Sequence, residues 1–282
     1  MTDTFFSMDG ARTLEGTVAG ACSLEELLGI GGLGPVFRAY DRELGREVAL
    51  RRVWPSRSLD LEAWRVELDA LARLDAPTVA RVLRAFEADG ILHVAGELVR
   101  PSASLMDRVR ADGPLAPREV ARLGIAVLGG LCAMHEVGAL HRALDPREIL
   151  LRPDGIPTIV GAEPPRRPPD PEAKGVAIGN PTYTAVETFL GDMRHTPASD
   201  LYALGCSLFL ALTGRAPYHR SRTVHDMVTH KLGKGEPTSA RADAPAEAPD
   251  PLIRVIDGLM APDPGARPSA DGARQLLLEA AC

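Results

Sequence analysis

The chain has 282 residues, of which 45% are apolar and 25% are charged, the balance of an ordinary globular protein. Its net charge of −6 gives no support to a protein that binds nucleic acid by neutralising phosphates. No apolar run reaches the ~20 residues of a membrane-spanning helix and no secretory signal is visible, so we expect a cytoplasmic protein without membrane contact. The four cysteines form no CxxC pair, which disfavours a disulfide framework or a zinc site.

The first hundred residues are predicted to be mostly β-strand. Residues 1–22 show no strong periodicity, so we expect a loose N-terminal extension there. Short β-like runs dominate residues 23–99, for example 36–40 and 47–53, with polar turns between them. The segment 61–74 is the exception, because its apolar residues recur at the spacing of a helix with one buried face.

The rest of the chain is predicted to be mainly helical. The segments 115–135 and 198–213 are the most apolar and favour buried helices. Residues 163–172 contain five prolines and are predicted to form a loop. The sequence therefore predicts an α+β fold, with a small β-rich lobe over 23–99 and a larger helical lobe over 100–282.

Several motifs follow one another along the chain. Residues 29–36, GIGGLGPV, fit the pattern G-x-G-x-x-G-x-V, a weak signal by itself because glycine-rich turns are common. A strand follows, in which VALR occupies 48–51, and Glu67 lies mid-helix sixteen residues after Arg51. The later segments are HRALDPREILL (141–151), GNPTYTAVE (179–187), SDLYALG (199–205), LTGRAP (212–217) and DPGARP (263–268).

In order and spacing, these segments resemble the landmarks of a bacterial-type serine/threonine protein kinase domain over residues 23–278. The resemblance implies a bilobal protein-kinase-like fold, in which the β-rich lobe and the helical lobe enclose a nucleotide. Kinases of this family transfer the γ-phosphate of ATP to protein hydroxyls, which requires a few charged side chains and magnesium in place.

Those charged side chains are the positions at which this sequence departs from the family. By alignment with the kinase motifs, five positions have changed. Arg51 stands at the position of the strand lysine, Ala143 at that of the catalytic aspartate and Asp145 at that of the loop lysine. Glu148 stands at the position of the metal-binding asparagine, and Gly161-Ala162-Glu163 at that of D-F-G. Alanine and glycine have no side chain that takes a proton or binds a metal. We therefore predict a pseudokinase with no catalytic and no metal-binding residue. A less favoured alternative recruits Asp145 and Glu148 as base and metal ligand.

Other residues are expected, by resemblance, to keep structural roles. Glu187 is predicted to pair with Arg267, which locks the end of the activation segment onto the large lobe. Asp200 is predicted to hydrogen-bond the backbone around residues 141–142. Glu67 is predicted to pair with the residue at the strand-lysine position, and a solvated glutamate on the helix surface is the alternative.

Two further groups allow a functional and a structural interpretation. The hydroxyls at 182–184 lie in the activation segment, where Arg142 would receive a phosphate, but structural hydroxyls are the simpler interpretation. The histidines at 219, 225 and 230 match no common metal spacing and are expected at the surface.

The nucleotide site is predicted to be weakened. Its candidate residues are Gly29, Gly31, Gly34, Val36, Ala49 and Arg51. Backbone N–H groups and a guanidinium can still meet phosphate oxygens, so ATP is expected to bind weakly and independently of magnesium; an empty, collapsed cleft is the alternative. Gly96, near the position before the hinge, and Ala162, in place of the D-F-G phenylalanine, leave room behind the adenine site.

The sequence thus predicts a regulatory or scaffolding module with a protein partner, such as an active kinase or another signalling protein. The alternative is a divergent serine/threonine kinase of low activity.

Overall fold

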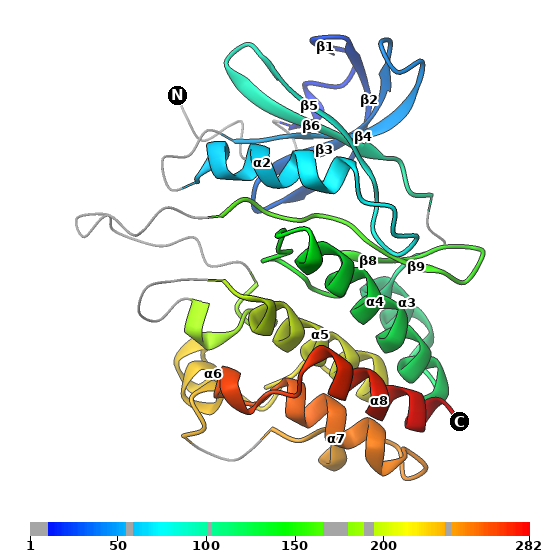
Figure 1. Ribbon diagram of the computed structural model, residues 1–282, viewed down its shortest axis with the longest axis vertical. Helices are drawn as coiled ribbons and strands as arrows, with labels where there is room; N and C mark the ends of the chain where they lie inside the picture. Colours follow the sequence, from blue (N-terminus) through cyan, green and yellow to red (C-terminus); the bar gives the residue numbers. More distant parts are fainter. Residues whose placement is uncertain (1–10, 55–58, 101–102, 166–179, 189–194, 235–237) are drawn as a thin grey trace.

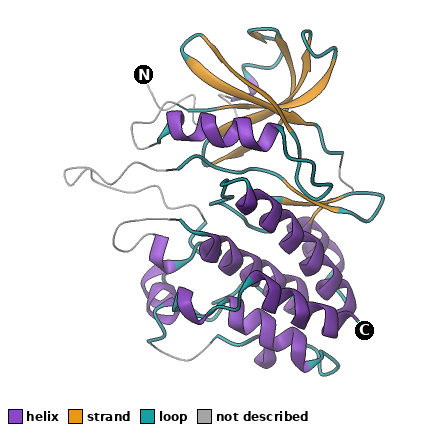
Figure 2. Cartoon of the chain, viewed as in Figure 1, coloured by secondary structure: helices purple, strands orange, loops and turns teal. Residues whose placement is uncertain are grey.

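The computed structural model describes residues 11–54, 59–100, 103–165, 180–188, 195–234 and 238–282. A curled sheet with one long helix beside it forms the small lobe, and a bundle of helices forms the large lobe (Figure 1). The strands are concentrated in the small lobe and the helices in the large lobe (Figure 2). This is the predicted α+β, two-lobed architecture, and the sequence prediction of the fold is confirmed.

The small lobe contains one antiparallel sheet in the order β1-β2-β3-β4-β6-β5. Its strands are β1 (Val18–Ala19), β2 (Cys22–Gly31), β3 (Gly34–Asp41), β4 (Arg46–Arg52), β5 (Val82–Ala88) and β6 (Ile91–Glu97). The predicted runs at 36–40 and 47–53 correspond to β3 and β4. One face of the sheet packs around buried apolar side chains such as Phe37, Val48 and Leu50.

Residues 11–22 are part of this lobe rather than a loose extension. Strand β1 pairs with β2, and the side chains of Ala11, Ala19 and Cys22 are buried. The expected loose extension is therefore wrong for residues 11–22. The pairing with β2 orders this segment, and a strand of two residues is too short to be recognised from sequence periodicity. Residues 1–10 lie outside the described residues.

Helix α2 (Leu61–Ala72) packs against β5 and carries the predicted apolar face. Its first turn is capped by Asp60, whose Oδ1 accepts a hydrogen bond from the Ala63 N–H at 3.1 Å. Trp64, Leu68 and Leu71 recur at helical spacing and are buried. Glu67 is half-buried on the same helix, and its carboxylate reaches the large lobe.

The large lobe is built on two long helices that the sequence predicted. Helix α4 (Pro117–Glu136) packs against α5 (Pro197–Thr213), and nearly all of α5 is buried, as its continuous apolar sequence requires. The other helices are α3 (Leu105–Asp112), α6 (Val224–Lys231), α7 (Asp250–Leu259) and α8 (Ala270–Ala281). Short 3₁₀ turns occupy Val186–Thr188, Ala240–Ala242 and Pro264–Ala266.

A second, three-stranded sheet lies at the cleft and was not predicted. It consists of β7 (Ala103–Ser104), β8 (Ile149–Leu151) and β9 (Pro157–Ile159). Strands of two or three residues are too short to show periodicity, which is why sequence reasoning missed them. The sheet positions the segment from 141 to 163, which forms the floor of the cleft.

Three smaller expectations concern loops, thiols and membranes. Residues 163–165 lie in a loop, as predicted, whereas 166–172 fall outside the described residues. All four cysteines are free thiols. Within the described ranges, none of the helices combines the length and apolarity that crossing a bilayer demands.

Candidate functional site

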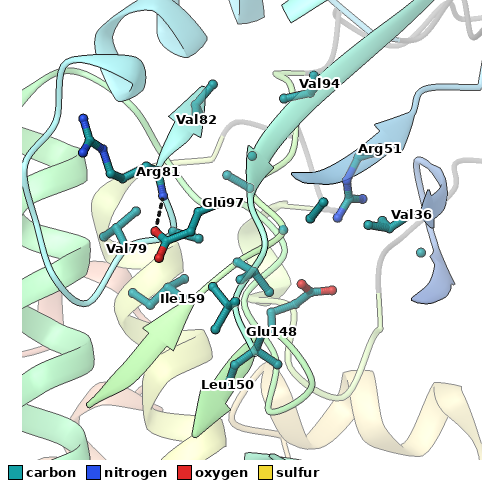
Figure 3. A pocket seen from close by; sticks show the side chains of 18 of the residues that line it. Val36, Arg51, Val79, Arg81, Val82, Val94, Glu97, Glu148, Leu150 and Ile159 are labelled. Atoms are coloured by element: carbon teal, nitrogen blue, oxygen red, sulfur yellow. Dashed lines mark hydrogen bonds between the residues drawn. The ribbon is translucent and has the colours of Figure 1, made fainter. Parts of the chain in front are cut away.

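The cleft between the lobes contains a cavity of about 420 Å³. Figure 3 shows its walls, with Val36 and Arg51 on the small-lobe strands and Glu148, Leu150 and Ile159 below them. A cavity of this size is in the range of small-molecule sites, roughly 300–1,000 Å³. The cleft is therefore open, and the collapsed alternative is not the state seen here.

Five of the six predicted nucleotide-site residues line this cavity: Gly29, Gly31, Val36, Ala49 and Arg51. The sixth, Gly34, is not among the lining residues. Its φ is +133°, and a Cβ there would lie 2.1 Å from the backbone oxygen of Arg52. Gly34 is thus required by the close approach of two strands, whatever the cavity binds.

Arg51 lies at the strand-lysine position but makes none of the contacts expected there. It stands opposite Val36 on β3 and Val94 on β6. Its Nη1 is 3.4 Å from the point where a Cβ on Gly31 would be, so the guanidinium lies against the glycine-rich loop. Among the described residues, the guanidinium makes no hydrogen bond or ion pair with a carboxylate.

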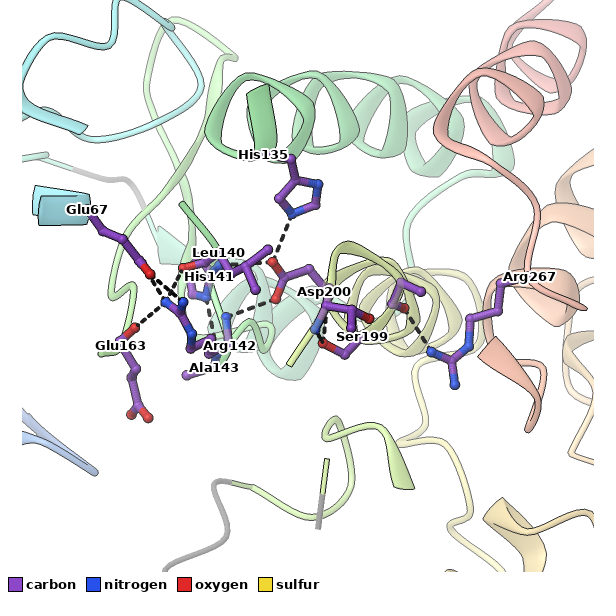
Figure 4. Close-up of polar contacts among 12 residues, drawn as sticks. Glu67, His135, Leu140, His141, Arg142, Ala143, Glu163, Ser199, Asp200 and Arg267 are labelled. Carbon is purple, nitrogen blue, oxygen red and sulfur yellow. Dashed lines mark hydrogen bonds and ion pairs between the residues drawn. The ribbon is translucent and has the colours of Figure 1, made fainter. Parts of the chain in front are cut away.

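Glu67 pairs with Arg142 instead of Arg51, so the predicted Glu67–Arg51 pair is wrong. The Arg142 guanidinium donates from Nη1 to Glu67 Oε2 at 2.7 Å and from Nη2 to Oε1 at 2.6 Å. Nη1 also donates to the backbone oxygens of Leu140 and Glu163 (Figure 4). The fork geometry of arginine suits this two-point contact, which ties α2 of the small lobe to the catalytic-loop position of the large lobe.

Glu148 fills the space that a side chain at position 161 would need. A Cβ on Gly161 would lie 1.9 Å from Oε2 of Glu148, and the φ of Gly161 is +86°. The carboxylate of Glu148 therefore stands where a D-F-G aspartate would begin. An aspartate cannot occupy position 161 unless the side chain at position 148 moves away.

The environment of Glu148 favours its neutral form. Burial raises the pKa of this carboxyl to about 7, the charges of Asp145 and Glu163 add to the rise, and Arg51 opposes it. Near neutral pH the side chain is therefore partly protonated, and a protonated carboxyl is a poor ligand for a divalent cation.

The remaining catalytic-loop positions offer no free base. Ala143 has no polar side chain, and its N–H donates to Nδ1 of His141 at 3.3 Å. Asp145 is held by its neighbour Arg147, with Oδ1 accepting from the backbone N–H at 2.6 Å and Oδ2 lying 3.1 Å from Nη1. These contacts give no support to Asp145 as a replacement base.

The family uses magnesium to hold ATP, and the residues present do not fit that ion. Glycine stands at the aspartate position, and the buried carboxyl of Glu148 replaces a neutral amide. Within the described part of the chain, no group of three His, Cys, Asp or Glu side chains is placed to bind a metal. The histidines at 219 and 225 are exposed and that at 230 is half-buried.

Below the cleft, Asp200 organises the catalytic-loop backbone as predicted. Its Oδ2 accepts from the N–H of His141 and its Oδ1 from the N–H of Arg142, both at 2.9 Å, and His135 Nε2 lies 2.9 Å from Oδ2 (Figure 4). Burial would raise the pKa of Asp200, but the hydrogen bonds from His135 and the backbone outweigh it, and the pKa lies below its ordinary value.

The predicted pair of Glu187 and Arg267 is also confirmed. The two distances are 2.5 Å and 2.9 Å, and the Arg267 side chain is only 1% exposed. Arg267 further donates to the backbone oxygens of Ala198 and Ala261. The pair therefore ties the 3₁₀ turn Val186–Thr188 to the start of α5 and to the segment that follows α7.

Lys231 is an anchor that sequence reasoning missed. Its ammonium is buried and donates to the backbone oxygens of Thr182 and Thr184 and to the hydroxyl of Tyr202. Burial lowers its pKa to about 8. Nothing in the sequence marks this lysine, because its acceptors are two main-chain oxygens and a tyrosine nearly thirty residues away.

Two of the three hydroxyl residues at 182–184 are held by the fold. The Thr184 hydroxyl donates to the Asn180 oxygen at 2.9 Å, and the Tyr183 side chain is buried. Arg142, the expected receiver of a phosphate, is occupied by Glu67. The structural interpretation made from the sequence is favoured.

Comparisons with known proteins agree with the two lobes and with the motif order. The family model of the protein kinase domain matches residues 22–277. The serine/threonine-protein kinase PknK of Mycobacterium tuberculosis is 39% identical over 210 residues, which cover 72% of this chain and 18% of PknK. PknD of the same species is 31% identical over 267 residues, covering 92% and 39%. PkaA of Streptomyces coelicolor is 30% identical over 273 residues, covering 88% and 48%.

The chain thus spans less than half the length of each of these relatives. All three are serine/threonine-protein kinases by name. The matched range includes both lobes and every motif described above. The chain belongs to the protein kinase domain family.

Proposed function

We propose that the chain is a pseudokinase that works as a regulatory or scaffolding module through protein contacts. The observation that carries the proposal is the pairing of Glu148 with Gly161. The carboxyl of Glu148 occupies the space that a side chain at position 161 would need, so no aspartate is present there to hold a metal. Ala143 removes the base as well. Loss of a general base lowers the reaction rate by ~10²–10⁴-fold, and loss of the metal removes several kcal/mol of transition-state stabilisation in addition.

The contacts of Glu67 support the same proposal. In a kinase of this family the glutamate of this helix would hold the strand cation that binds phosphate. Here Glu67 is bound on both oxygens by Arg142, which leaves Arg51 without that orientation. The side chains that would position ATP for transfer are therefore arranged for stability and not for chemistry.

A phosphoryl-transfer assay tests the absence of activity. The purified chain is incubated with labelled ATP and magnesium or manganese, with generic protein substrates and a known active kinase as positive control. We expect neither autophosphorylation nor substrate labelling. A clear signal that disappears in Asp145→Ala or Glu148→Ala would overturn the proposal and establish the divergent-kinase alternative.

A second assay addresses nucleotide. We propose that ATP binds weakly and that magnesium does not strengthen it, because the glycine-rich loop and Arg51 remain while the metal holders do not. Thermal shift with ATP, with and without magnesium, measures this. Stabilisation seen only with magnesium would contradict it.

The partner is proposed to be a protein, either an active kinase or another signalling protein. The start of helix α6 offers an exposed apolar side chain, Val224, 61% exposed, on the large lobe. Co-purification with the wild-type chain and with Val224→Asp, compared with an exposed large-lobe control such as Ala242→Asp, identifies the partner and tests whether this face contributes.

A further inference from the structure

The segment between α5 and α6 lies on the large lobe and is rich in positive charge (Figure 1). Residues 215–222, RAPYHRSR, contain three arginines and one histidine and no acidic residue, and we call them the basic loop. The side chains of Arg215 and Arg220 are each 60% exposed. Because the whole chain has a net charge of −6, the basic loop is opposite in sign to the rest of the sequence.

Three side chains of the basic loop converge on one carboxylate. Asp243 follows the 3₁₀ turn Ala240–Ala242, and its side chain is only 8% exposed. Its Oδ1 lies 3.3 Å from Nη1 of Arg215 and 3.2 Å from Nη2 of Arg220. Nε2 of His219 lies 3.9 Å from the same oxygen. Among the described residues that meet there, two guanidinium charges share one carboxylate, so the cluster keeps a net positive charge.

The fold holds the backbone of the basic loop in place. Tyr218 has a φ of +59°, a left-handed conformation that is uncommon for residues other than glycine. Its ring is buried, and its hydroxyl lies 2.8 Å from the hydroxyl of Tyr202. The N–H of Ser221 donates to the backbone oxygen of Tyr218 at 2.9 Å, and its Oγ lies 2.9 Å from Nδ1 of His230. Positions 219 and 220 lie between these two anchors, so little order has to be imposed there on binding.

A small cavity of about 40 Å³ lies beside the shared carboxylate. Its lining includes His219, Arg220, His230, Ser239 and Asp243. One water needs about 10–15 Å³ of such space, so the cavity has room for about two or three waters. Sites for drug-sized molecules are roughly 300–1,000 Å³, so a ligand can place only a compact polar group here.

The donors at this cavity suit a phosphate group. A phosphate monoester carries about −1.5 to −2 charges at pH 7 and has three strong acceptor oxygens. Each guanidinium has five N–H donors, and the contacts with Asp243 use one nitrogen of Arg215 and one of Arg220. Asp243 repels an anion, but it is already bound to both guanidiniums and acts as a positioning residue that holds the two forks together. Arginine forks match the geometry of phosphate oxygens.

Exposed apolar side chains near the basic loop favour a protein segment as the source of the phosphate. Val224, the first residue of α6, is 61% exposed, and Leu232, directly after the helix, is 38% exposed. Val224 is four residues after Arg220, so the chain keeps their Cα atoms within about 14 Å of each other. A free phosphate ion gains nothing from these side chains, whereas a short peptide reaches from the arginine to the valine.

From this arrangement we propose that the basic loop docks a phosphorylated serine or threonine of a partner protein. The phosphate binds Arg215 and Arg220, and an apolar side chain of the same segment packs on Val224. The inference rests on the proposed function, in which the chain works through protein contacts, and it names the chemistry of the partner. It assigns no role to the cleft.

Immobilised peptide pools test the proposal by biolayer interferometry with the whole chain. One pool consists of ten-residue peptides with a fixed central phosphothreonine and random flanking residues, and the matched pool has unmodified threonine. We expect saturable binding to the phosphorylated pool and at least tenfold weaker binding to the unmodified pool. Inorganic phosphate should compete only at millimolar concentration, because it lacks the apolar contact.

Matched variants locate the site. Arg215→Gln and Arg220→Gln should each weaken binding to the phosphorylated pool about tenfold. Val224→Ser should weaken it roughly threefold by removing apolar contact. Arg222→Gln is the control, because it removes another exposed arginine of the basic loop whose guanidinium lies outside the described contacts of Asp243. It should change the affinity by no more than about twofold, since only screened charge at a distance is lost. All four side chains are exposed, so the melting temperatures should stay the same.

The proposal is overturned if the two pools bind equally, or if inorganic phosphate binds as tightly as the phosphorylated pool. It is also overturned if Arg222→Gln weakens binding as much as Arg220→Gln, because the positive charge would then act diffusely and not as a site. A chain that phosphorylates substrates but meets these binding expectations would contradict the proposed function alone. A chain that shows neither phosphoryl transfer nor a preference for the phosphorylated pool would contradict this inference alone.

Discussion

Two regions of this molecule differ in what their charged side chains do. In the large lobe, Arg267 binds Glu187 and Asp200 binds three donors, and these residues are the ones that the kinase motifs predict. In the cleft, Glu67 pairs with Arg142 rather than with Arg51. The carboxyl of Glu148 occupies the position at which a D-F-G aspartate side chain would begin.

The difference shows which constraints the fold itself imposes. The large-lobe pairs are buried, so removing one partner leaves an uncompensated charge in a poorly solvated place. In the cleft, Arg51 faces an open cavity and has no ion pair among the described residues, so a change at this position costs little stability. A chain can therefore lose kinase chemistry while the kinase fold persists, and the following changes test that contrast.

The largest effect is expected for Arg267→Ala. The guanidinium is 1% exposed and also donates to main-chain oxygens, so its loss leaves Glu187 unpaired. We expect a decrease of about 3–5 kcal/mol in the free energy of unfolding, measured by urea denaturation. A decrease no larger than that of Arg51→Gln would mean that the large-lobe pair contributes no more to the free energy of unfolding than Arg51 in the cleft does.

The next effect is a pH dependence that Glu148 introduces. Its ordinary pKa is 4.5, and burial raises the pKa to about 7 in the folded chain. Between these values the folded state keeps a proton that the unfolded state has lost, so raising the pH through this window removes stability. Relative to Glu148→Gln, the wild type should lose roughly 3 kcal/mol over the whole window.

The measurement is urea denaturation of both proteins at several pH values from 4 to 8. The difference between wild type and Glu148→Gln should change steadily over the window and then level off above pH 7. Parallel curves would show that the carboxyl is not buried as described.

A smaller effect is expected for Glu67→Gln, which removes the charge and one of the two acceptor oxygens from the contact between the lobes. The side chains of Glu67 and Arg142 are 15% and 7% exposed, so the pair is mostly but not fully buried. We expect a loss of about 2 kcal/mol in thermal or urea unfolding. Asp69→Asn, an exposed change on the same helix, is the control and should alter stability by less than ~0.5 kcal/mol.

The smallest effect is expected for Arg51→Gln. Among the described residues its guanidinium has no ion pair, so stability at neutral pH should change by no more than ~0.5 kcal/mol. Because Arg51 lowers the pKa of Glu148, the variant should shift the Glu148-dependent pH window upward. A large loss of stability would reveal a structural contact of Arg51 and weaken the contrast with Arg267.

The sequence by itself determined the family, the two lobes and the long helices, because these depend on periodicity and on motif order. The burial of Trp64, Leu68 and Leu71 follows from helical spacing alone. The pair of Glu187 and Arg267 was predictable because the motifs around both residues are intact.

Only the tertiary structure decided the partners of side chains whose motifs have changed. The motifs predicted Arg51 as the partner of Glu67, but in the folded chain the carboxylate of Glu67 on α2 meets the guanidinium of Arg142. The same holds for two other contacts. Glu148 fills the space beside Gly161, and the ammonium of Lys231 donates to Thr184; both contacts join segments that are separate in the sequence. Sequence spacing cannot supply such distances, since they arise from how the two lobes pack against each other.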